Sequence, residues 1–192
     1  MGYNAVSTRE IAQAASVNHA AIGFHFKGKQ GLYEAVIEYT VAELRGVVEP
    51  FISTINKNIE DCGGDKVLLR QLVFFAVEQF LNVSMRTERS RWINVLLQRE
   101  YVDPSEAFEC IYNEVANPVF GAIERLVKSA SGEESKTNRS QITVYCIMSL
   151  LTNMGRDRAM LLKRFDSDIY EPDMFTTLIY VVAQGICGIL GF

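Results

Sequence analysis

The chain has 192 residues, of which 48% are hydrophobic and 22% are charged, and only four are prolines. This length and apolar content suffice to bury one substantial core with a small appended module, and the scarcity of proline leaves long helices unobstructed. The net charge of −4 excludes a generally basic coat for nucleic acid. Residues 1–30 nevertheless carry a balance of +2, which suits local contact with DNA but is also within ordinary scatter.

Residues 7–34 predict two short helices, a tight turn and the start of a third helix. Ser7 and Glu10 have the spacing of a capping box, in which each side chain satisfies a backbone N–H group at the start of a helix. Asn18 is a good N-cap for a second helix, which we expect to run from His19 to about Phe26. This arrangement is that of a helix-turn-helix DNA-binding unit.

The second of these short helices has the composition of a helix that reads DNA. Asn18 and His19 place polar groups where the first turn would meet base edges in a major groove. Small residues at Ala20, Ala21 and Gly23 leave little bulk between the backbone and the DNA. Lys29 follows at the start of the next helix, where free N–H groups and a lysine suit a DNA phosphate.

Two runs of this sequence resemble a known family. The run from Ser7 to Tyr33 resembles the DNA-binding region of TetR-type transcriptional regulators, and the run from Gln98 to Val119 is similar to their CecR-type ligand-binding domain. The resemblance implies an all-α fold, with a DNA-binding domain at residues 1–45 and an effector-binding and dimerisation domain at residues 46–192. It also implies a ligand-responsive regulator, most simply a repressor that a small molecule releases from a double-stranded DNA operator.

The family pattern assigns phosphate contacts to Phe24, His25 and Lys29 of this chain. The family commonly has tyrosine at position 24, and phenylalanine lacks the hydroxyl group that could donate to a phosphate oxygen. The complete set of DNA contacts that we expect also includes the start of the first helix. It is Ser7, Thr8, Arg9, Asn18, His19, Ala20, Ala21, Gly23, Phe24, His25 and Lys29.

The family normally has a whole helix before the segment that matches Gly2 and Tyr3, whereas this sequence begins at Met1. We hypothesise that either the start codon lies further upstream or the protein is a shortened form. In the second case DNA binding would be weak or lost, because two short helices bury too little area to order themselves firmly. The alternative function is then a helical dimer that binds a small molecule but not DNA.

Downstream of residue 28 the pattern predicts one helix after another. A helix from Lys29 runs towards Pro50, with an extension to about Asn58, and the Gly63-Gly64 pair ends it. The segment 68–83 is apolar on nearly every face and should be central in a bundle. Further helices are expected at 92–101, 105–130, 141–165 and 174–190, with a polar, mobile loop at 132–140.

A helical body rich in aromatic residues could enclose an effector pocket. Aromatic and polar residues within the apolar helices are the candidates for its wall, although each aromatic side chain is also ordinary core filler. The candidates are Gln71, Phe74, Phe75, Glu78, Trp92, Phe108, Tyr112, Met148 and Asn153.

The last two helices are the expected homodimer interface, because the family generally pairs there and two DNA half-sites require two-fold symmetry. Residues 174–192 contain no charged side chain. A membrane anchor would explain the same composition, but polar residues and glycines interrupt the run and no basic cluster flanks it. We therefore expect no membrane partner and a cytoplasmic protein.

The remaining motifs argue against a metal site and against catalysis. The four cysteines, Cys62, Cys110, Cys146 and Cys187, are far apart and have no nearby histidine, so no structural zinc site and no cofactor is expected. The segment 23–30 nearly spells a phosphate-binding P-loop, but Gln30 stands where magnesium coordination needs a hydroxyl group. We therefore expect that the protein is not an enzyme.

Overall fold

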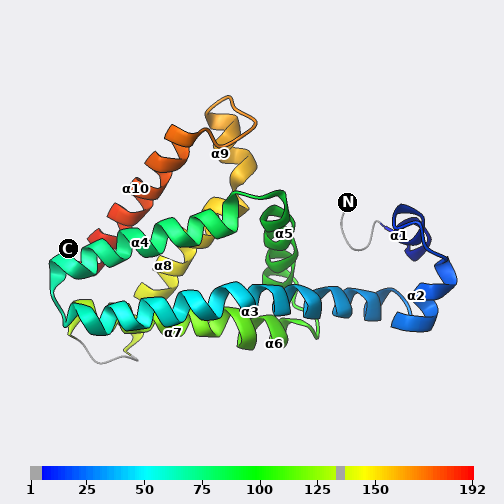
Figure 1. The fold of residues 1–192 in the computed structure, drawn as a ribbon, viewed down its shortest axis with the longest axis horizontal. Helices are drawn as coiled ribbons and strands as arrows, with labels where there is room; N and C mark the ends of the chain where they lie inside the picture. The colour runs from blue at the N-terminus through cyan, green and yellow to red at the C-terminus, as the bar shows by residue number, and fades with distance from the viewer. Residues whose placement is uncertain (1–5, 133–136) are drawn as a thin grey trace.

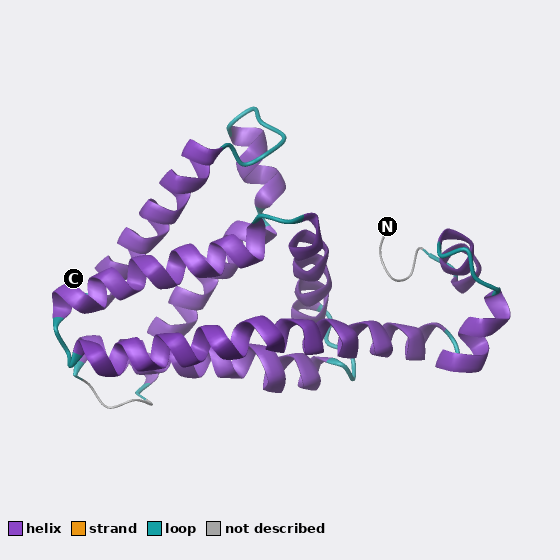
Figure 2. Cartoon of the chain, viewed as in Figure 1, coloured by secondary structure: helices purple, strands orange, loops and turns teal. Residues whose placement is uncertain are grey.

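The computed structural model describes residues 6–132 and 137–192, and the regular structure of these residues is helical (Figures 1 and 2). The predicted all-α class is confirmed. The first part of the chain forms α1 (Thr8–Ala14), α2 (His19–Phe26), α3 (Lys29–Cys62), α4 (Lys66–Met85) and α5 (Glu88–Val102). The second part forms α6 (Phe108–Ile111), the π-helical turn η2 (Tyr112–Ala116), α7 (Asn117–Ser131), α8 (Asn138–Arg156), α9 (Arg158–Arg164) and α10 (Pro172–Leu190).

The helix α3 connects the two functional ends of the molecule. Its 34 residues make it about 50 Å long at ~1.5 Å per residue. Figure 1 shows α1 and α2 at one tip of α3, outside the bundle that packs around its other end. The helix continues through Pro50 and ends at Cys62, four residues later than the predicted limit at Asn58. The expected domain boundary after residue 45 therefore lies inside a continuous helix.

The predicted helix 105–130 begins later than expected and contains a π-helical turn. Helical structure starts at Phe108, because the Ser105 hydroxyl and backbone N–H groups both donate to the carboxylate of Glu100 instead. Within the helix, the N–H group of Asn117 donates to the carbonyl of Tyr112, five residues earlier. Pro118 follows directly, and a proline ring clashes with the carbonyl four residues before it, so a locally widened turn relieves the crowding.

The predicted helix 141–165 is two helices, α8 and α9, separated at Asp157. Gly155 and Asp157 both favour interruption, glycine through its backbone entropy and aspartate through its preference for caps. The helix α8 also begins earlier than predicted, at Asn138, where the Thr137 hydroxyl accepts a hydrogen bond from the Ser140 N–H group. Of the loop expected at 132–140, residues 133–136 lie outside the described part of the chain.

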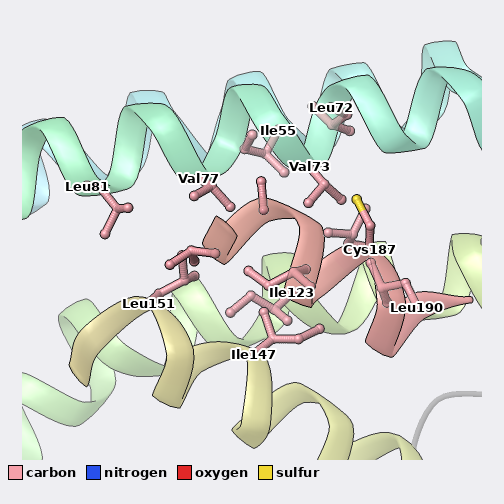
Figure 3. Close-up of a cluster of buried hydrophobic side chains, with 14 of the residues drawn as sticks. Ile55, Leu72, Val73, Val77, Leu81, Ile123, Ile147, Leu151, Cys187 and Leu190 are labelled. Carbon is pink, nitrogen blue, oxygen red and sulfur yellow. The ribbon is translucent and has the colours of Figure 1, made fainter. Parts of the chain in front are cut away.

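The main core surrounds α4, as its apolar pattern predicts. Leu69 and Leu81 on α4 are completely buried, and α4 packs against α3, α5, α8 and α10. Figure 3 shows part of this core, with Val77 and Leu81 of α4 among the labelled side chains. Both α4 and α10 are long and apolar enough to cross a membrane, judged by length and composition alone. Both contribute residues such as Val77 and Ile186 to this core cluster, as core helices of a bundle do.

Candidate nucleic-acid interface

The helix α1 is fixed at its start by the predicted capping box. The Ser7 hydroxyl accepts a hydrogen bond from the Glu10 N–H group at 3.2 Å, and the Glu10 carboxylate accepts from the Ser7 N–H group at 2.7 Å. The hydrogen bonds that the Ser7 N–H group and then the Ser7 hydroxyl donate to this carboxylate hold the pKa of Glu10 below its ordinary value, and the charge of Lys29 adds to the effect.

The helix α2 begins as predicted at Asn18, whose side-chain oxygen accepts from the Ala20 N–H group at 2.9 Å. Only the oxygen of this side chain caps the helix, so its amide nitrogen remains a donor on an exposed residue. Ile22 is the buried residue of α2 and anchors it to the neighbouring helices, whereas Ala20 and Gly23 are exposed. The polar start and the small face of α2 are thus accessible.

His19 and Thr8 join the two short helices. The Nε2 atom of His19, the first residue of α2, lies 2.9 Å from the Oγ1 atom of Thr8, the first residue of α1. This contact brings the beginnings of both helices to one place. Two residues predicted separately as DNA contacts are therefore neighbours in space.

The end of α2 presents an exposed aromatic pair. The Phe24 side chain is 84% exposed, and its ring meets that of His25 edge to face, with centroids 5.0 Å apart. The pair lies directly before the turn into α3. This is the position that the phosphate-contact prediction assigned to the two residues.

A tight turn joins α2 to α3. Lys27 has a φ of 58° and Gly28 a φ of 120°, and no side chain caps the first turn of α3. A Cβ atom at Gly31 would overlap the carbonyl oxygen of Phe26, so the two helices meet too closely for any other residue at position 31. The uncapped N–H groups of α3 and Lys29 lie together at this turn, as an anion site requires.

The eleven predicted DNA contacts all lie on α1, α2, their caps or the start of α3. Eight of them are exposed, and Thr8, Ala21 and Lys29 are partly buried. The set is compact and accessible, which is the geometry that DNA contact needs.

The nine predicted pocket residues are spread over five elements. Gln71 and Phe75 line a common hollow, whereas Phe74 packs against Tyr180 of α10 with centroids 5.7 Å apart. Phe108 and Tyr112 stack on each other. Trp92 is 57% exposed, Glu78 is exposed, Asn153 is partly buried and Met148 packs against the main core.

Two hollows on other sets of residues are better defined than any site that the nine predicted residues form together. One, of about 330 Å³, opens where α3 meets α4 and is lined by Asn58, Asp61, Cys62, Leu68, Gln71, Leu72 and Phe75. The other is a small core cavity of about 40 Å³ with apolar walls from α3, α4, α7, α8 and α10. Its walls are Phe51, Ile55, Val73, Ala76, Val77, Phe80, Val119, Ala122, Ile123, Leu126, Leu151 and Ile186. None of the nine predicted residues lines this core cavity, whereas Gln71 and Phe75 line the first hollow.

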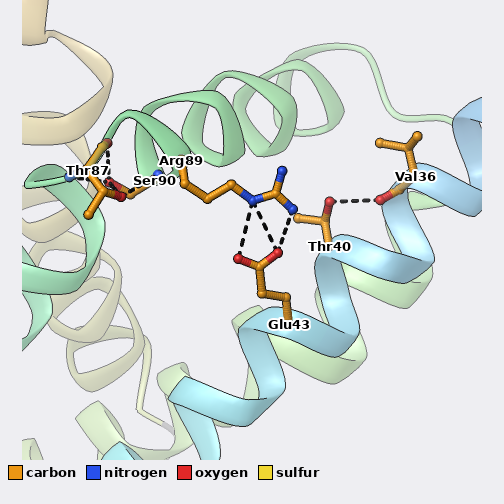
Figure 4. Close-up of polar contacts among 6 residues, drawn as sticks. All are labelled: Val36, Thr40, Glu43, Thr87, Arg89 and Ser90. Carbon is orange, nitrogen blue, oxygen red and sulfur yellow. Dashed lines mark hydrogen bonds and ion pairs between the residues drawn. The ribbon is translucent and has the colours of Figure 1, made fainter. Parts of the chain in front are cut away.

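The sequence reasoning did not single out the junction between α3 and α5. The Arg89 guanidinium group on α5 donates to both carboxylate oxygens of Glu43 on α3, while the Thr40 hydroxyl on α3 donates to the Val36 carbonyl (Figure 4). At the other end of α5, Glu100 is completely buried and accepts a hydrogen bond from Tyr33. No periodicity or motif marks the Glu43–Arg89 and Tyr33–Glu100 pairs, because the two partners of each pair are distant in sequence.

Comparison with known proteins finds a family of transcriptional regulators for both the N-terminal and the C-terminal part of the chain. Residues 1–36 match the family model described as bacterial regulatory proteins, tetR family. Residues 69–187 match the family model described as the C-terminal domain of the HTH-type transcriptional dual regulator CecR. The two matched segments leave residues 37–68 between them, which include the larger part of α3.

Individual relatives are also regulators rather than enzymes. The chain is 22% identical over 162 residues to the "HTH-type transcriptional dual regulator CecR" of Shigella flexneri, which covers 83% of this chain and 72% of that protein. It is 40% identical over 73 residues to the "Probable HTH-type transcriptional regulator YttP" of Bacillus subtilis (strain 168), covering 38% of this chain and 33% of that protein.

Proposed function

Because the chain belongs to the TetR family of bacterial transcriptional regulators and has a CecR-type C-terminal domain, we propose that it is a cytoplasmic repressor released from its operator by a small molecule. The observation that supports the DNA-binding part is the exposed polar start of α2, whose other end joins the uncapped start of α3 through a tight turn. We propose that Asn18 and His19 read bases from this surface and that the start of α3 holds a phosphate.

The contacts of this surface divide into two kinds. Asn18 and His19 are exposed polar residues at the first turn of α2, where side chains reach base edges in the major groove. Lys29 and the first N–H groups of α3 would hold a phosphate, which fixes the position of α2 without reading sequence. We propose that Asn18 and His19 determine the sequence preference and that Lys29 contributes to affinity for any sequence.

The experiment that tests this proposal is in vitro selection of DNA sequences, followed by fluorescence anisotropy over a salt series. H19Q is expected to change the preferred sequence. K29Q is expected to weaken binding to all sequences and to reduce the slope of log affinity against log salt by about 0.9. K57Q, on the exposed side of α3 far from α2, is the matched charge control and should leave both unchanged.

Failure of the wild-type protein to select any sequence would contradict the DNA-binding proposal. The alternative of a helical dimer that binds a small molecule without DNA would then be favoured. Equal effects of K29Q and K57Q would contradict only the assignment of the phosphate site.

We place the effector in the apolar core cavity rather than among the nine predicted pocket residues. The described cavity is small, but five helices form its wall, so a ligand that enlarges it must displace at least one of them. Phe51 and Ile55 belong to α3, whose other end carries α2. A screen of uncharged apolar compounds for operator release tests this placement, and release by charged polar compounds alone would contradict it.

We propose that the homodimer forms through α8 and α10. On α10, Tyr180, Val181 and Ile189 are exposed although α10 from Met174 onward has no charged residue. On α8, Ile142 and Tyr145 are also exposed. Large exposed apolar side chains on two packed helices favour burial against a second copy, and an isologous contact would present two copies of α2 to two half-sites.

A further inference from the structure

Glu100, near the end of α5, is a buried carboxylate that the proposed DNA and effector contacts do not use. Its exposed fraction is 0%, and it is the only charged side chain in the buried class among the described residues. A buried charge is costly unless hydrogen bonds compensate it, so its partners are expected to be closely fixed.

Both oxygens of this carboxylate are occupied, by partners from two different segments. The Tyr33 hydroxyl on α3 donates to Oε1 at 2.6 Å. The Ser105 hydroxyl and N–H groups, in the connection between α5 and α6, donate to Oε2 at 2.7 and 3.0 Å. The Arg99 guanidinium group lies 4.6 Å from the centroid of the Tyr33 ring and packs over it. Tyr33 is thus held through both its hydroxyl group and its ring.

The location of Tyr33 gives this contact its significance. Tyr33 is four residues after Lys29, in the part of α3 that carries α1 and α2. The backbones of α3 and α5 approach each other at few points, so side chains rather than close backbone packing join the two helices. The polar contacts between them include Tyr33 with Glu100 and the exposed pair of Glu43 with Arg89 in Figure 4. Between these two contacts along α3, Ile37 and Val41 share an apolar cluster with Leu96 and Leu97 of α5.

The two contacts differ in strength. On α3 they are separated by about 15 Å, since each residue of a helix advances ~1.5 Å. The Glu43–Arg89 pair is exposed on both sides, and an exposed ion pair is worth little in water. The buried, fully bonded Glu100 is the firmer of the two and is also the one nearer to α2.

We propose that Tyr33, Glu100 and Ser105 form a positioning contact that sets the direction in which α3 carries the DNA-reading helices. The inference rests on the proposed DNA-binding function. Loss of the Tyr33 hydroxyl leaves the buried apolar contacts of Ile37 and Val41 intact but frees the turns of α3 that precede them, so α2 no longer meets the groove in one fixed orientation. Sequence-specific binding should suffer more than non-specific binding, which depends mainly on charge.

The test compares Y33F, E100Q and the double variant with Y39F. Tyr39 is on the same helix and is exposed, so Y39F removes a hydroxyl group that has no described hydrogen bond. Y33F and E100Q should each lower the ratio of specific to non-specific DNA affinity by about tenfold, since a hydrogen bond to a charged group is lost. The two changes should be non-additive in the double variant, and Y39F should behave as wild type.

A purely structural role predicts a different result, in which both affinities fall in parallel with the thermal midpoint. That result, or a wild-type ratio in Y33F, would overturn the proposal. Hydrogen exchange provides a readout without DNA: Y33F should exchange faster than Y39F at residues 29–36. If the wild-type protein selects no DNA sequence, the proposed function fails, and unchanged protection of residues 29–36 in Y33F then overturns the positioning contact by itself.

Discussion

At the scale of single residues, Glu100 shows how environment decides the role of a carboxylate. Burial raises its pKa, but hydrogen bonds from Tyr33 and Ser105, together with the charge of Arg99, outweigh burial and leave the pKa below the ordinary value of 4.5. The ionised form is therefore the one that the folded protein stabilises. Its neighbour in sequence, Tyr101, is partly exposed and has no comparable partner set among the hydrogen bonds described.

A group with a lowered pKa makes stability depend on pH in one direction. The stability from Glu100 should be fully present above the ordinary pKa of 4.5 and should be lost as the pH falls through the lowered folded-state value. Urea denaturation of wild type and E100Q at a series of pH values measures this. E100Q should be less stable at neutral pH, and the difference should shrink below pH 4.5. A difference that is constant with pH would show that Glu100 does not stay ionised in the fold.

At the scale of elements, the turn between α2 and α3 decides whether the DNA-reading module keeps its shape. The sequence predicted the starts of α1 and α2 and the extent of α2, because capping residues and apolar spacing are local signals. The closeness of Gly31 to the Phe26 carbonyl has no such signal, since it depends on the angle between two helices.

Replacement of Gly31 by alanine should disrupt this turn. The added methyl group overlaps the Phe26 carbonyl oxygen, and such overlap typically costs about 1–3 kcal/mol. G31A should therefore weaken DNA binding by about tenfold or more, while the circular-dichroism melting of the helical body changes little. G46A is the control on the same helix, because a Cβ atom there meets nothing within 4 Å. It should keep DNA binding and gain about 0.5–1 kcal/mol of stability. Wild-type DNA affinity in G31A would contradict the close approach.

At the scale of the whole molecule, the predicted DNA contacts lie at one end of α3, and α10 from Met174 onward has exposed apolar side chains and no charged residue. The two features belong together in a dimeric regulator, because a second copy would cover the apolar surface and present a second tip to the same DNA.

A charge placed on the exposed face of α10 should therefore separate the subunits. Val181 is 59% exposed, so V181E does not disturb the core, but a dimer would bury the new carboxylate without a partner. Size-exclusion chromatography with light scattering should show a monomer for V181E. V102E, at the exposed end of α5, is the matched control and should behave as wild type. If V181E is still a dimer over the concentrations at which the wild-type protein is a dimer, the interface lies elsewhere.

The sequence by itself determined the helical class, the starts of α1 and α2, the central place of α4 and the family, because capping, periodicity and a short DNA-binding motif are local properties. Tertiary structure decided the rest. It joined Tyr33 to Glu100 across 67 residues of sequence. It also gave the core cavity a wall that shares no residue with the predicted pocket. Pockets and buried hydrogen bonds depend on how helices pack. The residue pattern of one helix does not predict which face of a neighbouring helix it contacts.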